Sequence, residues 1–123
     1  EFSLFGDVGG IMSEQAIIER REQLARTAMR EALENQQAED SVELFIQHHL
    51  EEIESTYWQK HFGTPLPTLL QVLEFLILDH GWEGSDFESY EMLDFTLPEE
   101  ITNYVICVSF DEREQVIDIS MES

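Results

Sequence analysis

Apolar residues recur at helical spacing along the first two thirds of the chain. Over residues 13–36 they fall three and four positions apart, and Ser13 can cap the amino end of this first predicted helix. The same spacing predicts a second helix over about residues 40–63. A third helix is predicted over about residues 64–79, closed by Gly81. Because this third segment is apolar on nearly every side, we expect it to be buried on nearly every side.

Beyond Gly81 the period changes from helical to alternating, which is typical of β-strands. Three short strands are predicted, over about residues 88–97, 102–110 and 115–121. The polar residues 111–114 connect the last two strands and predict a β-hairpin. We expect the segment 97–100 to form a turn or a single helical turn.

This order of elements predicts an α+β fold, with three helices followed by an antiparallel sheet of about three strands and the helices packed on one face. Three strands alone would not make an independent core, so we expect residues 12–123 to form a single domain. Met12 is followed at once by a helix start, and residues 1–11 are therefore expected to be a tag or an upstream-encoded segment.

A sheet covered on one side leaves its other face open, and alternation predicts which residues lie there. Ile117, Ile119 and Met121 are expected to share the core side of the last strand. The residues expected on the opposite side of the last two strands are Val105, Cys107, Ser109, Val116, Asp118 and Ser120. This face could meet solvent, a partner or a second copy of the chain.

The charge of the chain narrows the choice of partner. There are 27 acidic residues against 6 Lys and Arg, which gives a formal net charge of -21. From residue 37 onward, 20 acidic side chains stand against only Lys60 and Arg113. Such a surface repels phosphate backbones, so we expect no nucleic-acid partner. The chain also has no run of about 18 apolar residues, so we expect no membrane span.

The single cysteine, Cys107, cannot form an internal disulfide, which favours a protein of the reducing cytoplasm. It lies in the middle of a predicted strand among apolar neighbours. A nucleophilic thiol needs a helix amino end or a basic neighbour to lower its pKa, and neither is nearby in the sequence. We therefore expect Cys107 to be a small packed side chain.

The histidines are the other candidates for chemistry. His48 and Glu52 share one helix face, as do His49 and Glu52, while His61 and His80 are isolated. Two ligands do not make a metal site, and His49 falls on the apolar stripe, which favours a hydrogen-bonded core histidine. Glycine-rich phosphate loops and the sequence motifs of catalytic nucleophiles are missing. We therefore predict no metal, no cofactor and no catalytic residue, which favours a protein that is not an enzyme.

Aromatic residues are interspersed with carboxylates around the first predicted strand. Rings supply contact area and carboxylates steer a basic partner, so this segment could bind a basic protein. The alternative is that the rings belong to the core and the carboxylates form a solvated face. The residues predicted to contact a partner are Trp82, Glu83, Asp86, Glu88, Tyr90, Glu91 and Asp94.

Three functions remain open at this point. The first is a small acidic cytoplasmic protein–protein interaction module of the immunity, inhibitor or accessory type, which binds a basic partner. The second is a small enzyme or ligand-binding domain with a pocket between the third helix and the sheet. The third is a homodimer through the first helix, where Ala28 and Ala32 could pack against a second copy. The strand, acidic turn and strand over residues 103–123 resemble the closing hairpin of several small bacterial domains, some of them similar to immunity proteins, but this pattern transfers no functional residue.

Overall fold

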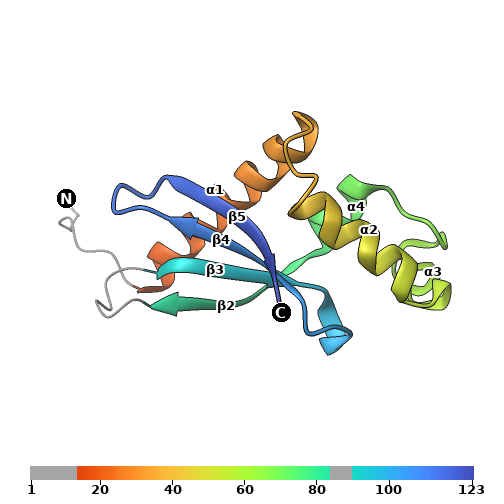
Figure 1. The fold of residues 1–123 in the computed structure, drawn as a ribbon. Helices are drawn as coiled ribbons and strands as arrows, with labels where there is room; N and C mark the ends of the chain where they lie inside the picture. Colours follow the sequence, from red (N-terminus) through yellow and green to blue (C-terminus); the bar gives the residue numbers. More distant parts are fainter. Residues whose placement is uncertain (1–13, 84–89) are drawn as a thin grey trace, which may run out of the picture.

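Helices and an antiparallel sheet build the fold, as Figure 1 shows for the computed structural model. The structure describes residues 14–83 and 90–123, so the predictions for residues 1–11 and for Ser13 lie outside the described residues. The α+β class is confirmed. In chain order the elements are α1 (Glu14–Glu34), α2 (Val42–Glu52), α3 (Ser55–Phe62), α4 (Leu69–Phe75), β2 (Ile77–Glu83), β3 (Tyr90–Thr96), the 3₁₀ turn η1 (Pro98–Glu100), β4 (Val105–Phe110) and β5 (Val116–Glu122).

The second predicted helix is two helices, α2 and α3. Ile53 ends α2 in an extended conformation, with φ -92° and ψ 139°, and its N–H donates to the carbonyl of His49. Helix α3 then begins at Ser55 and is closed by Gly63. This glycine has a φ of 73°, the left-handed conformation typical of a glycine at a helix end. The apolar pattern did not reveal the break because both helices bury side chains, among them Phe45 in α2 and Trp58 in α3.

The third predicted helix is wrong for most of its length. Its helical part, α4, is capped by Thr68, whose hydroxyl accepts from the N–H of Gln71 at 3.1 Å while the Gln71 side chain accepts from the N–H of Thr68 at 2.8 Å. Leu76 then takes an extended conformation, and the chain continues as the strand β2 through the position predicted for a closing glycine. Leu66, expected to be buried, is 72% exposed.

Within the described residues the sheet therefore has four strands, one more than predicted. Their order is β2-β3-β4-β5, and each neighbouring pair is antiparallel. The predicted hairpin between β4 and β5 is confirmed, since the Asp111 N–H donates to the carbonyl of Gln115 at 2.9 Å. The segment 97–100, predicted to be a turn or a single helical turn, contains the short 3₁₀ turn η1.

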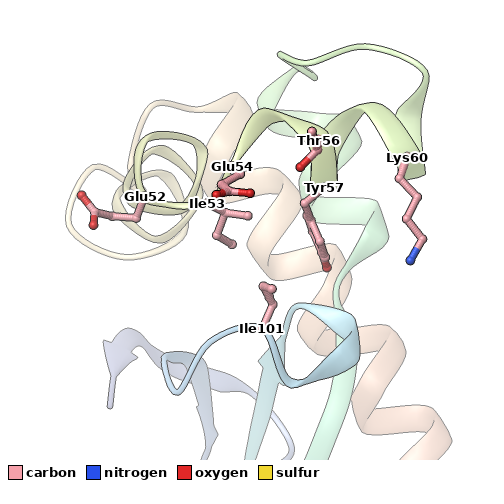
Figure 2. Close-up of a pocket in the computed structure, with 7 residues that line it drawn as sticks. All are labelled: Glu52, Ile53, Glu54, Thr56, Tyr57, Lys60 and Ile101. Atoms are coloured by element: carbon pink, nitrogen blue, oxygen red, sulfur yellow. The ribbon is translucent and has the colours of Figure 1, made fainter.

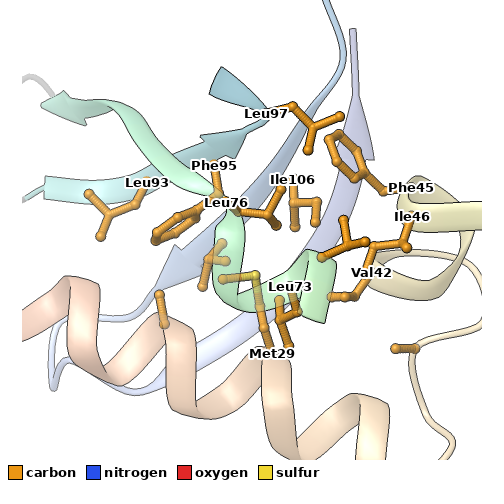
Figure 3. Packing of buried hydrophobic residues seen from close by; sticks show 14 of the residues in the cluster. Met29, Val42, Phe45, Ile46, Leu73, Leu76, Leu93, Phe95, Leu97 and Ile106 are labelled. Carbon is orange, nitrogen blue, oxygen red and sulfur yellow. The ribbon is translucent and has the colours of Figure 1, made fainter. Parts of the chain in front are cut away.

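Helix α1 lies along one face of the sheet, and α2, α3 and α4 group beyond the end where β2 begins (Figure 1). Alternate residues of β3 and β4 point to the helices, so Phe95, Ile106 and Val108 are fully buried. They belong to one cluster with Met29 of α1 and Phe45 of α2, and Figure 3 shows Phe95 and Ile106 in that cluster. The opposite face of the same strands is left uncovered by this cluster.

A β-bulge in β5 changes which residues reach that uncovered face. Ser109 pairs with Asp118 but Phe110 pairs with Val116, so Ile117 has no partner in the ladder. Val116 consequently packs against the core, although alternation placed it on the open face. Ile117, expected on the core side, is 63% exposed.

Candidate interaction surface

The face of the sheet opposite the core is a shallow hollow of about 560 Å³, which we name the open sheet face. Its lining comes from all four strands, together with Asn103 and the last residue, Ser123. It includes five of the six residues that alternation placed there, the exception being the core residue Val116. These five are Val105, Cys107, Ser109, Asp118 and Ser120.

Acidic side chains dominate the electrostatics of the open sheet face. Its lining carries four carboxylates, and in the part of the chain that the structure describes it includes no Lys or Arg. They are Asp79 on β2, Asp94 on β3, and Asp118 and Glu122 on β5. Asp118 and Glu122 are exposed on the edge strand, where the Ser120 hydroxyl donates to Glu122 at 2.7 Å. A cation approaching this face meets no described charge of its own sign.

Cys107 lies in the middle of the open sheet face, in surroundings that disfavour the reactive thiolate. Its exposed fraction is 9%, and its Cα partner across the ladder is Asp94, which is 5% exposed. Burial, reinforced by the neighbouring Asp94 carboxylate, raises the pKa of the Cys107 thiol to about 11. The thiol therefore stays protonated at neutral pH, as expected for a small packed side chain rather than a nucleophile.

The turn η1 extends the acidic surface beyond the end of the sheet. A second hollow, of about 480 Å³, shares Asp79, Asn103 and Val105 with the open sheet face and adds Glu99 and Glu100 of η1. The two adjoining hollows thus place carboxylates at intervals from β5 to the turn.

Unusual backbone geometry fixes this turn. Glu99 and Glu100 have φ values of 71° and 53°, a left-handed conformation that costs a non-glycine residue about 1 to 2 kcal/mol. Contacts from α3 hold it in place: Lys60 and His61 bind the two carboxylate oxygens of Glu99 at 3.1 and 3.2 Å. These hydrogen bonds hold the pKa of the Glu99 carboxyl below its usual value.

A third hollow lies on the other side of η1, between the α2–α3 corner and the loop that leads to β4. Figure 2 shows Ile53 and Tyr57 pointing from the helices toward Ile101 of the loop. We name this hollow, of about 530 Å³, the corner groove; its remaining lining is Glu52, Glu54, Thr56 and Lys60.

The residues predicted to contact a partner fall on or near β2 and β3. Asp86 and Glu88 lie outside the described residues. Trp82, Glu83 and Tyr90 are strand residues whose pairing is described but whose side chains are not. The remaining two are Glu91, which is exposed, and Asp94, which lines the open sheet face.

Sequence reasoning missed the corner groove and the role of η1. The signal available in the sequence was an isoleucine, Ile101, directly after the acidic pair Glu99 and Glu100. The groove needs the α2–α3 corner and this loop to meet, and the two are about 50 residues apart in sequence.

His49 is a core residue with both ring nitrogens bonded. Its Nδ1–H donates to the carbonyl of Phe45 at 2.6 Å, and Nε2 accepts from the Thr102 hydroxyl at 2.8 Å. Burial lowers the pKa of His49, which keeps this ring neutral. The side chain therefore fastens α2 to the loop before β4.

Two other kinds of site find no support within residues 14–83 and 90–123. No three His, Cys, Asp or Glu side chains there lie close enough to hold a metal ion. None of the helices there combines the length and the apolar character needed to cross a membrane.

Comparisons with protein families, with curated proteins and with solved structures find no match for this chain.

Proposed function

We propose that this protein is a small acidic interaction module of the reducing cytoplasm that binds a basic protein through the open sheet face. The observation that carries the proposal is the four carboxylates of that face, with no Lys or Arg in its described lining. A binding face of this kind needs no reactive group, which agrees with the raised pKa of Cys107.

The overall charge supports the same partner chemistry. A net charge of -21 on 123 residues produces a negative field that accelerates the encounter with a basic protein. Of the six Lys and Arg residues, Arg20, Arg21, Arg26 and Lys60 already pair with carboxylates of this chain. Most of the positive charges of the chain are therefore already paired, so they weaken the negative field at the open sheet face only slightly.

The open sheet face extends the surface predicted from the sequence. Asp94 belongs to both, and its exposed fraction of 5% means that it contributes charge rather than contact area. The edge-strand residues Asp118 and Glu122 are accessible, and we assign them the principal contacts.

The test is a pair of charge-matched variants measured against a basic protein captured from cell extract. Asp118→Asn/Glu122→Gln removes two charges from the open sheet face, while Glu31→Gln/Glu34→Gln removes two from exposed positions of α1. We expect the first pair to raise the Kd at least tenfold at low salt and the second pair to change it less than threefold. Equal effects of the two pairs would show that only total charge matters, and the assignment of the face would then be wrong.

The two alternative functions remain predictions. At the position expected for a ligand pocket, the buried side chains of Leu73, Leu76 and Phe95 occupy the space between α4 and the sheet (Figure 3). On α1, Ala32 packs against the core of its own chain. Neither observation favours these functions over the acidic face.

A further inference from the structure

We propose that the corner groove anchors one apolar side chain of the basic partner, flanked in that partner's sequence by Lys or Arg. This inference depends on the proposed function, because it adds a specific contact to the same complex. The apolar floor, the acidic rim and the rigidity of the groove together define this occupant.

The floor of the groove is apolar and partly open to solvent. Ile101 is 42% exposed although it faces Ile53 and the ring of Tyr57 across the groove (Figure 2). An incoming aliphatic or aromatic side chain would cover Ile101 and remove both apolar surfaces from water.

The rim of the groove selects the neighbours of that side chain. Glu52 and Glu54 are exposed at the α2–α3 corner beside Ile53. Lys60, the one Lys or Arg among the described lining residues, already binds Glu99 at 3.1 Å. The charge left for a ligand is negative, so basic residues next to the apolar anchor fit this rim.

The groove is also held in shape before any partner arrives. The Tyr57 hydroxyl donates to the carbonyl of Pro98 at 3.1 Å, and Glu99 is held from α3 by Lys60 and His61. The loop that presents Ile101 is thus fixed to the opposite wall. A preformed groove avoids the ordering cost that a mobile loop would add to binding.

Position links the groove to the open sheet face. Glu99 and Glu100 line the hollow that adjoins that face, and Ile101, the next residue, lines the groove. A single basic segment can therefore cross η1, with its anchor in the groove and its remaining cations over the sheet.

The test uses fluorescent peptides of the form Lys-Lys-X-Lys-Lys at low salt, with Leu or Ser at X. We expect the Leu peptide to bind about tenfold more tightly than the Ser peptide, because one apolar side chain is buried. Ile101→Ser should abolish this preference and leave the binding of the Ser peptide unchanged. The matched control is Ile117→Ser, which alters an isoleucine that is 63% exposed on β5 and outside the groove, and which should keep the preference.

The outcomes separate the two proposals. Binding that is equal for Leu and Ser, or a preference that survives Ile101→Ser, would overturn the anchor and leave the acidic face standing. Absence of salt-dependent binding for both peptides would overturn both proposals. Amide chemical shifts supply a second readout, since the Leu peptide alone should move the signals of Ile53 and Tyr57.

Discussion

Tyr57 is the residue whose environment gives the clearest solution signal. Burial, reinforced by the nearby Glu99 carboxylate, raises the pKa of Tyr57 from 10.0 to about 12. We expect the ultraviolet titration of the protein to contain one tyrosine that ionises near pH 12, and Tyr57→Phe should remove this step. Tyr104→Phe, which alters a tyrosine that is 37% exposed, is the control and should keep it. A wild-type protein without the late step would contradict the buried position of Tyr57.

The same shift determines how Tyr57 affects stability at high pH. Its folded pKa lies above the unfolded one, so the unfolded chain loses the proton first as the pH rises above 10. Stability therefore falls between pH 10 and about 12, and this part of the fall should be missing in Tyr57→Phe. At neutral pH the variant loses the hydrogen bond to Pro98, which we expect to cost about 1 kcal/mol in the free energy of urea unfolding.

Individual residues were predictable where their neighbours in sequence decide their environment. His49 lies on an apolar helical stripe and Cys107 between apolar strand neighbours, and both are buried as predicted. Val116 and Ile117 were assigned to the wrong faces because one unpaired residue at the bulge reverses the alternation beyond it. No glycine in β5 marks that bulge in the sequence.

At the scale of elements, the sequence predicted the type of a segment wherever one period continued long enough. Helix α1 and the hairpin of β4 and β5 lie where predicted. The failure lies in the apolar run that ends at Ile77 and Leu78, where α4 passes into β2. An apolar run of this length fits a buried helix as well as a short helix followed by a strand, and only the pairing of β2 with β3 decides between them.

The end of α1 makes a prediction at this scale. The Gln37 N–H donates to the carbonyl of Ala32 and the Gln36 N–H to that of Leu33, which is a Schellman ending with Gln36 at a φ of 59°. Glycine takes this conformation without the cost that a side chain adds. We expect Gln36→Gly to raise the free energy of unfolding by about 1 kcal/mol, measured by urea denaturation.

The neighbouring residue supplies the control for that substitution. Gln37 is also exposed but does not have a positive φ. Gln37→Gly should therefore leave the stability unchanged or lower it, because glycine only adds freedom to the unfolded chain there. Equal effects of the two substitutions would contradict the left-handed ending of α1.

At the scale of the whole molecule, the sequence revealed the charge and the fold class but not the binding surface. Composition alone shows that the chain is acidic beyond residue 37. The hollows join residues that are distant in sequence, such as Ile53 with Ile101 and Lys60 with Glu99. These contacts depend on how α2 and α3 pack against η1 and the loop after it, which no local sequence pattern predicts.

The net charge also predicts how salt affects folding. The net charge of -21 makes the acidic side chains repel one another in the folded state, so salt that screens this repulsion should stabilise the fold. We expect the Tm to rise by about 5 °C or more between 0.02 and 0.5 M KCl. An exposed ion pair such as Lys60–Glu99 opposes this trend only weakly, since such a pair contributes about 0 to 1 kcal/mol. Asp118→Asn/Glu122→Gln should reduce the rise in Tm, and calorimetry of both proteins measures it.

Salt should weaken the complex with a basic partner over the same range of KCl, so the stability of the fold and the affinity for the partner should change in opposite directions. A Tm that falls with KCl would show that the ion pairs outweigh the repulsion, and the negative field proposed to steer the partner would then be weaker than the formal charge implies.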